Sequence, residues 1–149
     1  MRNVVDLEAY MDAPKPEVIP TQQAADYLLV GEEMLENWLR AKGLVPTDKK
    51  KEGFRILALH RQGCKGDPSF NACRETCREL AYYYNLIFAQ PDSEEVVSRL
   101  TMMEMVARHL VLFIGNKMMD DQVGEFCCSA KVNKLNREKV ETLVGVNNG

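Results

Sequence analysis

The sequence has no apolar stretch long enough to cross a lipid bilayer. The apolar segment Leu110–Ile114 spans five residues, whereas a membrane-spanning helix needs about 20. Asp6 and Glu8 stand where a signal peptide would need an apolar run. We therefore expect a chain that has no export signal, does not bind a membrane and is located in the cytoplasm.

Sequence signatures of catalysis are also missing. Gly63 and Gly66 lack both the spacing and the preceding strand of a phosphate-cradling loop. No pair of carboxylates lies in an apolar setting, and no nucleophile is spaced with a base. We therefore expect a protein that is not an enzyme and has no organic cofactor.

The composition is that of an ordinary soluble domain. Hydrophobic residues make up 46% of the 149 residues and charged residues 28%, with a net charge of −3. Such a mild charge excludes a polycation that coats nucleic acid along its whole surface. The length fits one domain, or a small head joined to a helical body.

Residues 21–45 have the pattern of two short helices separated by a glycine. Apolar residues recur at helical spacing between Thr21 and Val30, and again from Leu35. Gly31 stands between the two runs, where a tight turn favours a residue without a side chain. The second run ends at Gly43, in the position of a left-handed helix cap. A basic turn follows, for which we expect two short flanking β-strands.

This order resembles the winged helix-turn-helix of MerR-type regulators and phage excisionases over residues 19–57. The resemblance implies a mainly α fold, with a winged helix-turn-helix head, a short β wing and a helical body that forms a homodimer. It also implies DNA binding and transcription regulation, with one helix in the major groove and the wing on phosphates. The resemblance is carried by Ala24, Ala25, Leu28, Val30, Leu35, Trp38, Gly43, Leu44, Pro46 and Gly53–Arg55.

The charge distribution supports contact with phosphates. Residues 40–65 hold eight basic and two acidic side chains, a balance of +6, whereas residues 1–39 hold two basic and eight acidic ones, a balance of −6. Such a split is typical of an electrostatic binding surface. The predicted DNA-contacting residues are Arg40, Lys42, Lys49, Lys50, Lys51 and Arg55.

One feature of the expected second helix departs from the MerR pattern. Its start holds Glu32, Glu33 and Glu36, which would face phosphates with the wrong sign. The alternative hypothesis is therefore a protein-interaction or adaptor module that uses the same head to meet a basic protein partner.

We expect three parts: an arm (1–20), a head (21–62) and a helical body for dimerisation or sensing (69–149). In the body, Ser69 caps a helix that ends near Ala89, and Asp92 or Ser93 caps a second, long helix. That long helix is apolar on nearly all sides, which is typical of a buried or dimer-forming helix. A last short helix is expected at residues 133–144.

The cysteines admit two interpretations. Five cysteines are an odd number, which argues against a closed disulfide framework. Pairs spaced four apart on a helix share one face and suit a soft metal or an iron–sulfur cluster. Cysteine is equally a small buried hydrophobe, and Cys73 and Cys77 fall on an apolar helix face. Candidate metal ligands are His60, Cys64, Cys73, Cys77, Cys127 and Cys128.

Overall fold

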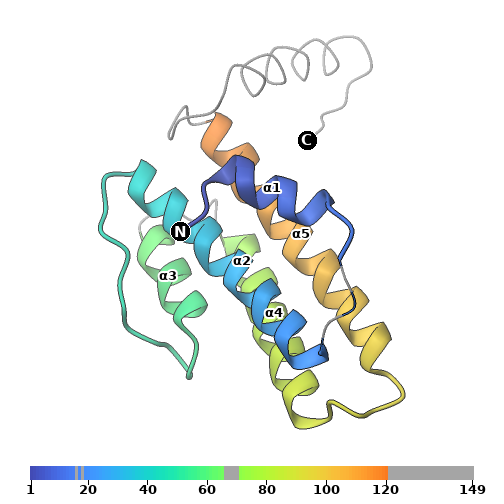
Figure 1. Cartoon of the computed structure of the whole chain (residues 1–149). Helices are drawn as coiled ribbons and strands as arrows, with labels where there is room; N and C mark the ends of the chain where they lie inside the picture. The colour runs from blue at the N-terminus through green and yellow to red at the C-terminus, as the bar shows by residue number, and fades with distance from the viewer. Residues whose placement is uncertain (16, 18, 66–70, 121–149) are drawn as a thin grey trace.

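The computed structural model describes residues 1–15, 17, 19–65 and 71–120 and is mainly helical, as the sequence predicts. Figure 1 shows the helices gathered around α2, which packs against each of the others. The described helices are α1 (Val4–Asp12), α2 (Pro20–Ala41), α3 (Arg55–Cys64), α4 (Asn71–Ala89) and α5 (Val96–Asp120).

The prediction of two helices separated by a turn at Gly31 is wrong. The chain forms one continuous helix, α2, which begins with Pro20 in its first turn and ends at Ala41. Gly43 closes the helix as expected, with a positive φ of 80°. The Leu44 N–H donates to Leu39 O and the Gly43 N–H to Arg40 O, both at 2.9 Å, which is the Schellman pattern.

Gly31 serves helix packing rather than a turn. A Cβ added at this position would lie 2.7 Å from Ile56 Cδ1, 2.9 Å from Leu80 Cδ1 and 3.3 Å from Leu110 Cδ2. These three side chains belong to α3, α4 and α5. The missing side chain therefore lets three helices approach α2 at one level, and this explains a glycine inside a long helix.

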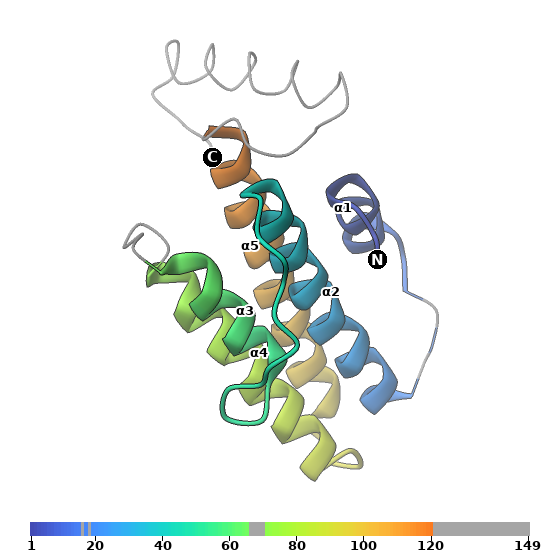
Figure 2. The same ribbon diagram turned by 90° about the vertical axis from the view of Figure 1, so that its left-hand side faces the viewer.

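The segment between α2 and α3 is an extended loop, and the expected wing strands are not confirmed. Figure 2 shows this segment running back along the bundle and turning beside α4. The described residues contain no strand, only an isolated antiparallel bridge between Lys51 and Phe54. Glu52 and Gly53 between them have φ of 55° and 86°, the signature of a two-residue type I′ turn.

All described helices contribute to one hydrophobic core. Its largest fully buried side chains come from α1, α2, α3, α4 and α5 alike, so the expected head and body share this core. Trp38 is 1% exposed, and its ring packs directly on Gly63, where any Cβ would overlap it. Trp38 and Leu35, which carry part of the sequence resemblance, both lie in this core.

Helix α5 follows the expected pattern on its inner face. Ser93 lies just before the first turn of α5, and its Oγ accepts a hydrogen bond from the Glu95 N–H at 3.1 Å. No helix within the described ranges combines the length and apolar character needed to cross a membrane. The expected cap at Ser69 and the expected helix at 133–144 lie outside the described residues. The inward-facing residues of α5 are Met103, Val106, Ala107, Leu110, Val111, Ile114 and Met118.

The N-terminal segment contains a helix that is anchored to the rest of the bundle. Arg108 of α5 donates to Met11 O at 2.7 Å and to Asp12 Oδ1 at 2.8 Å. Arg2 pairs with Glu33 of α2 at 2.6 Å. Residues 4–12 are therefore a part of the bundle rather than a free arm.

Candidate anion-binding face

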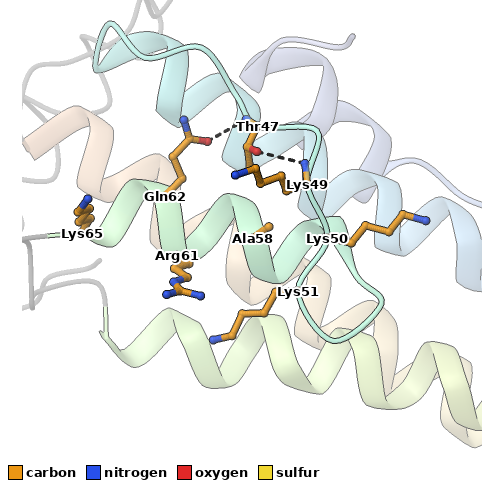
Figure 3. Close-up of a pocket in the computed structure, with 8 residues that line it drawn as sticks. All are labelled: Thr47, Lys49, Lys50, Lys51, Ala58, Arg61, Gln62 and Lys65. Carbon is orange, nitrogen blue, oxygen red and sulfur yellow. Dashed lines mark hydrogen bonds between the residues drawn. The ribbon is translucent and has the colours of Figure 1, made fainter.

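A basic hollow lies between the α2–α3 loop and α3, and we call it the loop hollow. Its volume is about 500 Å³. Figure 3 shows that its cations come from both sides: three lysines from the loop, Arg61 from α3 and Lys65 directly after α3. The residues that line it are Thr47, Lys49, Lys50, Lys51, Ala58, Arg61, Gln62 and Lys65.

Gln62 fixes the loop on α3. Its Oε1 accepts from the Thr47 N–H at 2.9 Å, and its Nε2 donates to Val45 O at 2.8 Å. The Lys49 N–H in turn donates to Thr47 Oγ1 at 3.1 Å (Figure 3). These bonds give an irregular loop a defined path. The lysines that follow are therefore held beside α3.

The five cations of the loop hollow are not paired with carboxylates in the part of the chain that the structure describes. Cations gathered this way repel one another, and an anion from outside relieves that repulsion. The arrangement therefore suits a ligand with several negative charges.

A second hollow adjoins the first and lies between α3 and α4; we call it the interhelix hollow. It has a volume of about 380 Å³ and shares Lys51 and Arg61 with the loop hollow. In Figure 3 the side chains of Lys51 and Arg61 both extend toward α4, whereas Lys50 points away. The residues that line the interhelix hollow are Lys51, Leu57, His60, Arg61, Cys64, Arg74 and Arg78.

Only three of the six predicted DNA-contacting residues line the two hollows. Lys49, Lys50 and Lys51 come together at the loop hollow. Arg40 is exposed and lines neither hollow. Lys42 donates to Gly63 O at 2.8 Å and lies 4.7 Å from the centre of the Trp38 ring, so its ammonium group fastens α2 to α3.

Arg55 also has a structural role. Its guanidinium lies 2.9 Å from Glu36 Oε2 and 3.7 Å from Asp48 Oδ1, and its Nε donates to Thr47 O at 2.9 Å. The side chains of Arg55 and Glu36 are 22% and 14% exposed. Its donors are thus occupied within the chain, and they hold the loop against α2.

Four cations that line the two hollows were not among the binding residues predicted from the sequence. Arg61 and Lys65 are four residues apart on and just after α3, and Arg74 and Arg78 are four apart on α4. This spacing places each pair on one side of its helix. The spacing was visible in the sequence, but the packing of α3 beside α4 that joins the pairs was not.

Two glutamates of α2 form ion pairs with arginines of the same chain. Glu33 is 9% exposed and pairs with Arg2, while Glu36 pairs with Arg55. Burial raises the pKa of Glu32 above its ordinary value, and Arg55 opposes that shift. Two of the three glutamates expected to meet a basic partner, Glu33 and Glu36, are therefore paired with the chain's own arginines.

Among the described residues, the predicted cysteine and histidine ligands do not gather into a metal site. Cys73 and Cys77 are buried in the core, and burial raises the pKa of the Cys73 thiol to about 12 and that of Cys77 well above its ordinary value. Within the described ranges no three histidine, cysteine or acidic side chains are close enough to share a metal. Cys127 and Cys128 lie outside those ranges.

Cys64 differs from the two buried cysteines. It is partly exposed, and its Sγ lies 3.8 Å from Nδ1 of His60, a side chain that is only 2% exposed. Both residues line the interhelix hollow. The thiol of Cys64 is therefore a natural reporter of what enters this hollow.

Comparisons with known protein families, with curated protein sequences and with solved structures find no match for this chain. The function must therefore be inferred from the site itself.

Proposed function

We propose that the protein binds DNA by contacting the phosphate backbone through the loop hollow. The observation that carries this proposal is the gathering of five cations with no salt-bridge partner among the described residues. Neutralising phosphates releases condensed counterions, which is the main source of affinity for nucleic acid without sequence specificity. The five cations are Lys49, Lys50, Lys51, Arg61 and Lys65.

The proposed contact is with the backbone rather than with bases. The part of α2 expected to act as a recognition helix is mostly covered, since Arg40 is the one exposed residue within 31–41. Phosphate contacts position a protein but carry no sequence information. We therefore expect similar affinity for duplexes of different sequence. A role in transcription regulation extends this proposal and rests on the sequence resemblance alone.

A matched pair of variants tests the proposal. In the first, Lys49, Lys50 and Lys65 of the loop hollow are changed to Gln; in the second, Arg40, an exposed cation outside both hollows, is changed to Gln. Affinity for a fluorescent random-sequence duplex is measured by anisotropy at low salt. The first variant is expected to bind about tenfold or more weakly, and the second within about threefold of wild type. Equal losses in the two variants would contradict the proposal.

A second candidate function is self-association through α5. Its outer face exposes apolar side chains that recur at helical spacing: Val97 (71% exposed), Met102 (40%), Met105 (59%) and Leu112 (53%). This face is the part of the predicted dimer helix that the core leaves uncovered, and we propose a second copy of the chain as its partner.

Light scattering coupled to size-exclusion chromatography tests the dimer. The charge-introducing changes Met105→Glu and Leu112→Glu should convert a dimer to a monomer, whereas Asn85→Glu, on an exposed position of α4, should not. A wild-type chain that is monomeric at high concentration would remove this candidate.

A further inference from the structure

The interhelix hollow differs from the loop hollow in shape and in chemistry. It is smaller, about 380 Å³, and it lies between two helices. Its walls include Leu57 and His60, which are only 6% and 2% exposed. Three of its lining residues are arginines. A guanidinium is a planar fork of donors that matches the oxygens of a phosphate group in pairs, which a lysine ammonium does not.

The hollow has an excess of positive charge. Lys51, Arg61, Arg74 and Arg78 line it, and no Asp or Glu among the described residues does. Glu52 accepts from Arg78 at 3.1 and 2.9 Å, and Glu75 acts on Arg78 from the same helix. Within the described residues, Lys51, Arg61 and Arg74 form no salt bridge.

We propose that the interhelix hollow binds a compact polyphosphate, a small molecule with two or more adjacent phosphate groups. Its volume falls at the lower end of the range for small-molecule sites. Adjacent phosphates place several negative charges close together, and this arrangement is complementary to the four cations that line the hollow. Because Lys51 and Arg61 also line the loop hollow, a phosphate chain longer than three units is able to continue from one hollow into the other.

This site is distinct from the proposed DNA contact, although the two share residues. Lys49 and Lys50 line only the loop hollow, and Arg74 lines only the interhelix hollow. Variants at these positions therefore separate the two binding activities. Failure of one proposal leaves the other standing.

Inorganic tripolyphosphate is the probe for this site, titrated into the full chain by isothermal calorimetry at constant ionic strength. Arg74→Gln, at an exposed position of α4, is expected to weaken binding about tenfold, the equivalent of one lost charge-assisted bond. Arg74→Lys keeps the charge but loses the fork and should fall between Gln and wild type. The control variant with Lys49 and Lys50 changed to Gln should stay within about threefold of wild type.

A second readout uses Cys64, which lines the same hollow. Tripolyphosphate should slow the alkylation of Cys64 in wild type, measured by peptide-resolved mass spectrometry, and should protect it less in Arg74→Gln. Slower alkylation together with the tenfold loss supports the site. An absence of binding, or equal weakening in the Arg74 variant and the lysine control, overturns it and indicates a diffuse layer of counterions.

Discussion

Arg55 and Glu36 neutralise each other at a distance of 2.9 Å. The sequence offers Arg55 as a cation for DNA and Glu36 as an obstacle to DNA, and the structure joins the two in one ion pair. Both side chains are mostly buried, and the pair connects the end of the basic loop to α2. Neither residue therefore belongs to the proposed binding surface.

Loss of this ion pair should reduce stability without reducing DNA affinity. Arg55→Ala leaves the Glu36 carboxylate largely buried without its partner, and we expect the free energy of unfolding to fall by about 2 kcal/mol. The exposed Lys49→Ala should change it by less than about 0.5 kcal/mol. Urea unfolding followed by the fluorescence of Trp38, the single tryptophan, measures both. If the Arg55→Ala protein has wild-type stability and weakened DNA binding, Arg55 contacts DNA and the structural role assigned to it is wrong.

Replacing either of two glycines inside helices by alanine should change the stability of the fold, in opposite directions. At Gly31 the new methyl group meets side chains of three helices at 2.7 to 3.3 Å, and we expect a loss of about 1–3 kcal/mol from overpacking. At Gly115 of α5 the nearest atoms lie at 3.7 and 3.9 Å. There alanine should add up to about 1 kcal/mol through better helix propensity. Thermal unfolding of the two variants checks the pair, and a stabilised Gly31→Ala protein would refute the packing role of Gly31.

The three described cysteines should differ in reactivity. At pH 8, Cys64 should react with iodoacetamide, because it is partly exposed. Cys73 and Cys77 should stay unmodified, since both are buried and burial raises the pKa of the Cys73 thiol to about 12. Peptide mass spectrometry before and after addition of urea measures the three sites. Rapid labelling of Cys77 in the folded protein would show that this part of the core opens readily.

Glu32 should make stability depend on pH. Burial raises the pKa of Glu32 in the folded protein above its ordinary value of 4.5, and Arg55 only partly offsets the effect. A raised folded-state pKa means that folding favours the protonated form. The charged form therefore destabilises the fold above that pKa, and the penalty disappears as the pH falls through it.

Glu32→Gln removes this titration. The variant should be more stable than wild type at pH 7, and its advantage should shrink as the pH is lowered toward 4.5. Thermal unfolding across this range measures the difference, with Glu79→Gln, at an exposed site on α4, as the control. An advantage that is the same at every pH would indicate that a change in packing, rather than charge, is responsible.

The helical body could be predicted from the sequence because its pattern is local. The apolar face of α5 and the cap at Ser93 follow from residues within one or two turns. Likewise, Gly43 could be placed at the end of α2, since a left-handed cap depends on its immediate neighbours. These elements lie where hydrophobic spacing and capping indicate.

The head could not be predicted in the same way, because the role of Gly31 depends on distant residues. A glycine between two apolar runs is consistent with a turn or with close helix packing, and only Ile56, Leu80 and Leu110 decide between them. The basic face depends on distant residues as well. Lys51, Arg61 and Arg74 line one hollow because α3 and α4 pack side by side. No spacing within the sequence shows that the two helices pack together.

The central claim is that a discrete set of cations at the loop hollow binds DNA phosphates. Its most direct test is the affinity of the purified chain for random-sequence duplex DNA across a series of salt concentrations. With five phosphate contacts, the logarithm of affinity should fall with the logarithm of salt concentration with a slope of about −4.5. Changing Lys49, Lys50 and Lys65 to Gln should reduce the slope by about one for each lysine. No binding at low salt, or an unchanged slope in that variant, would contradict the claim.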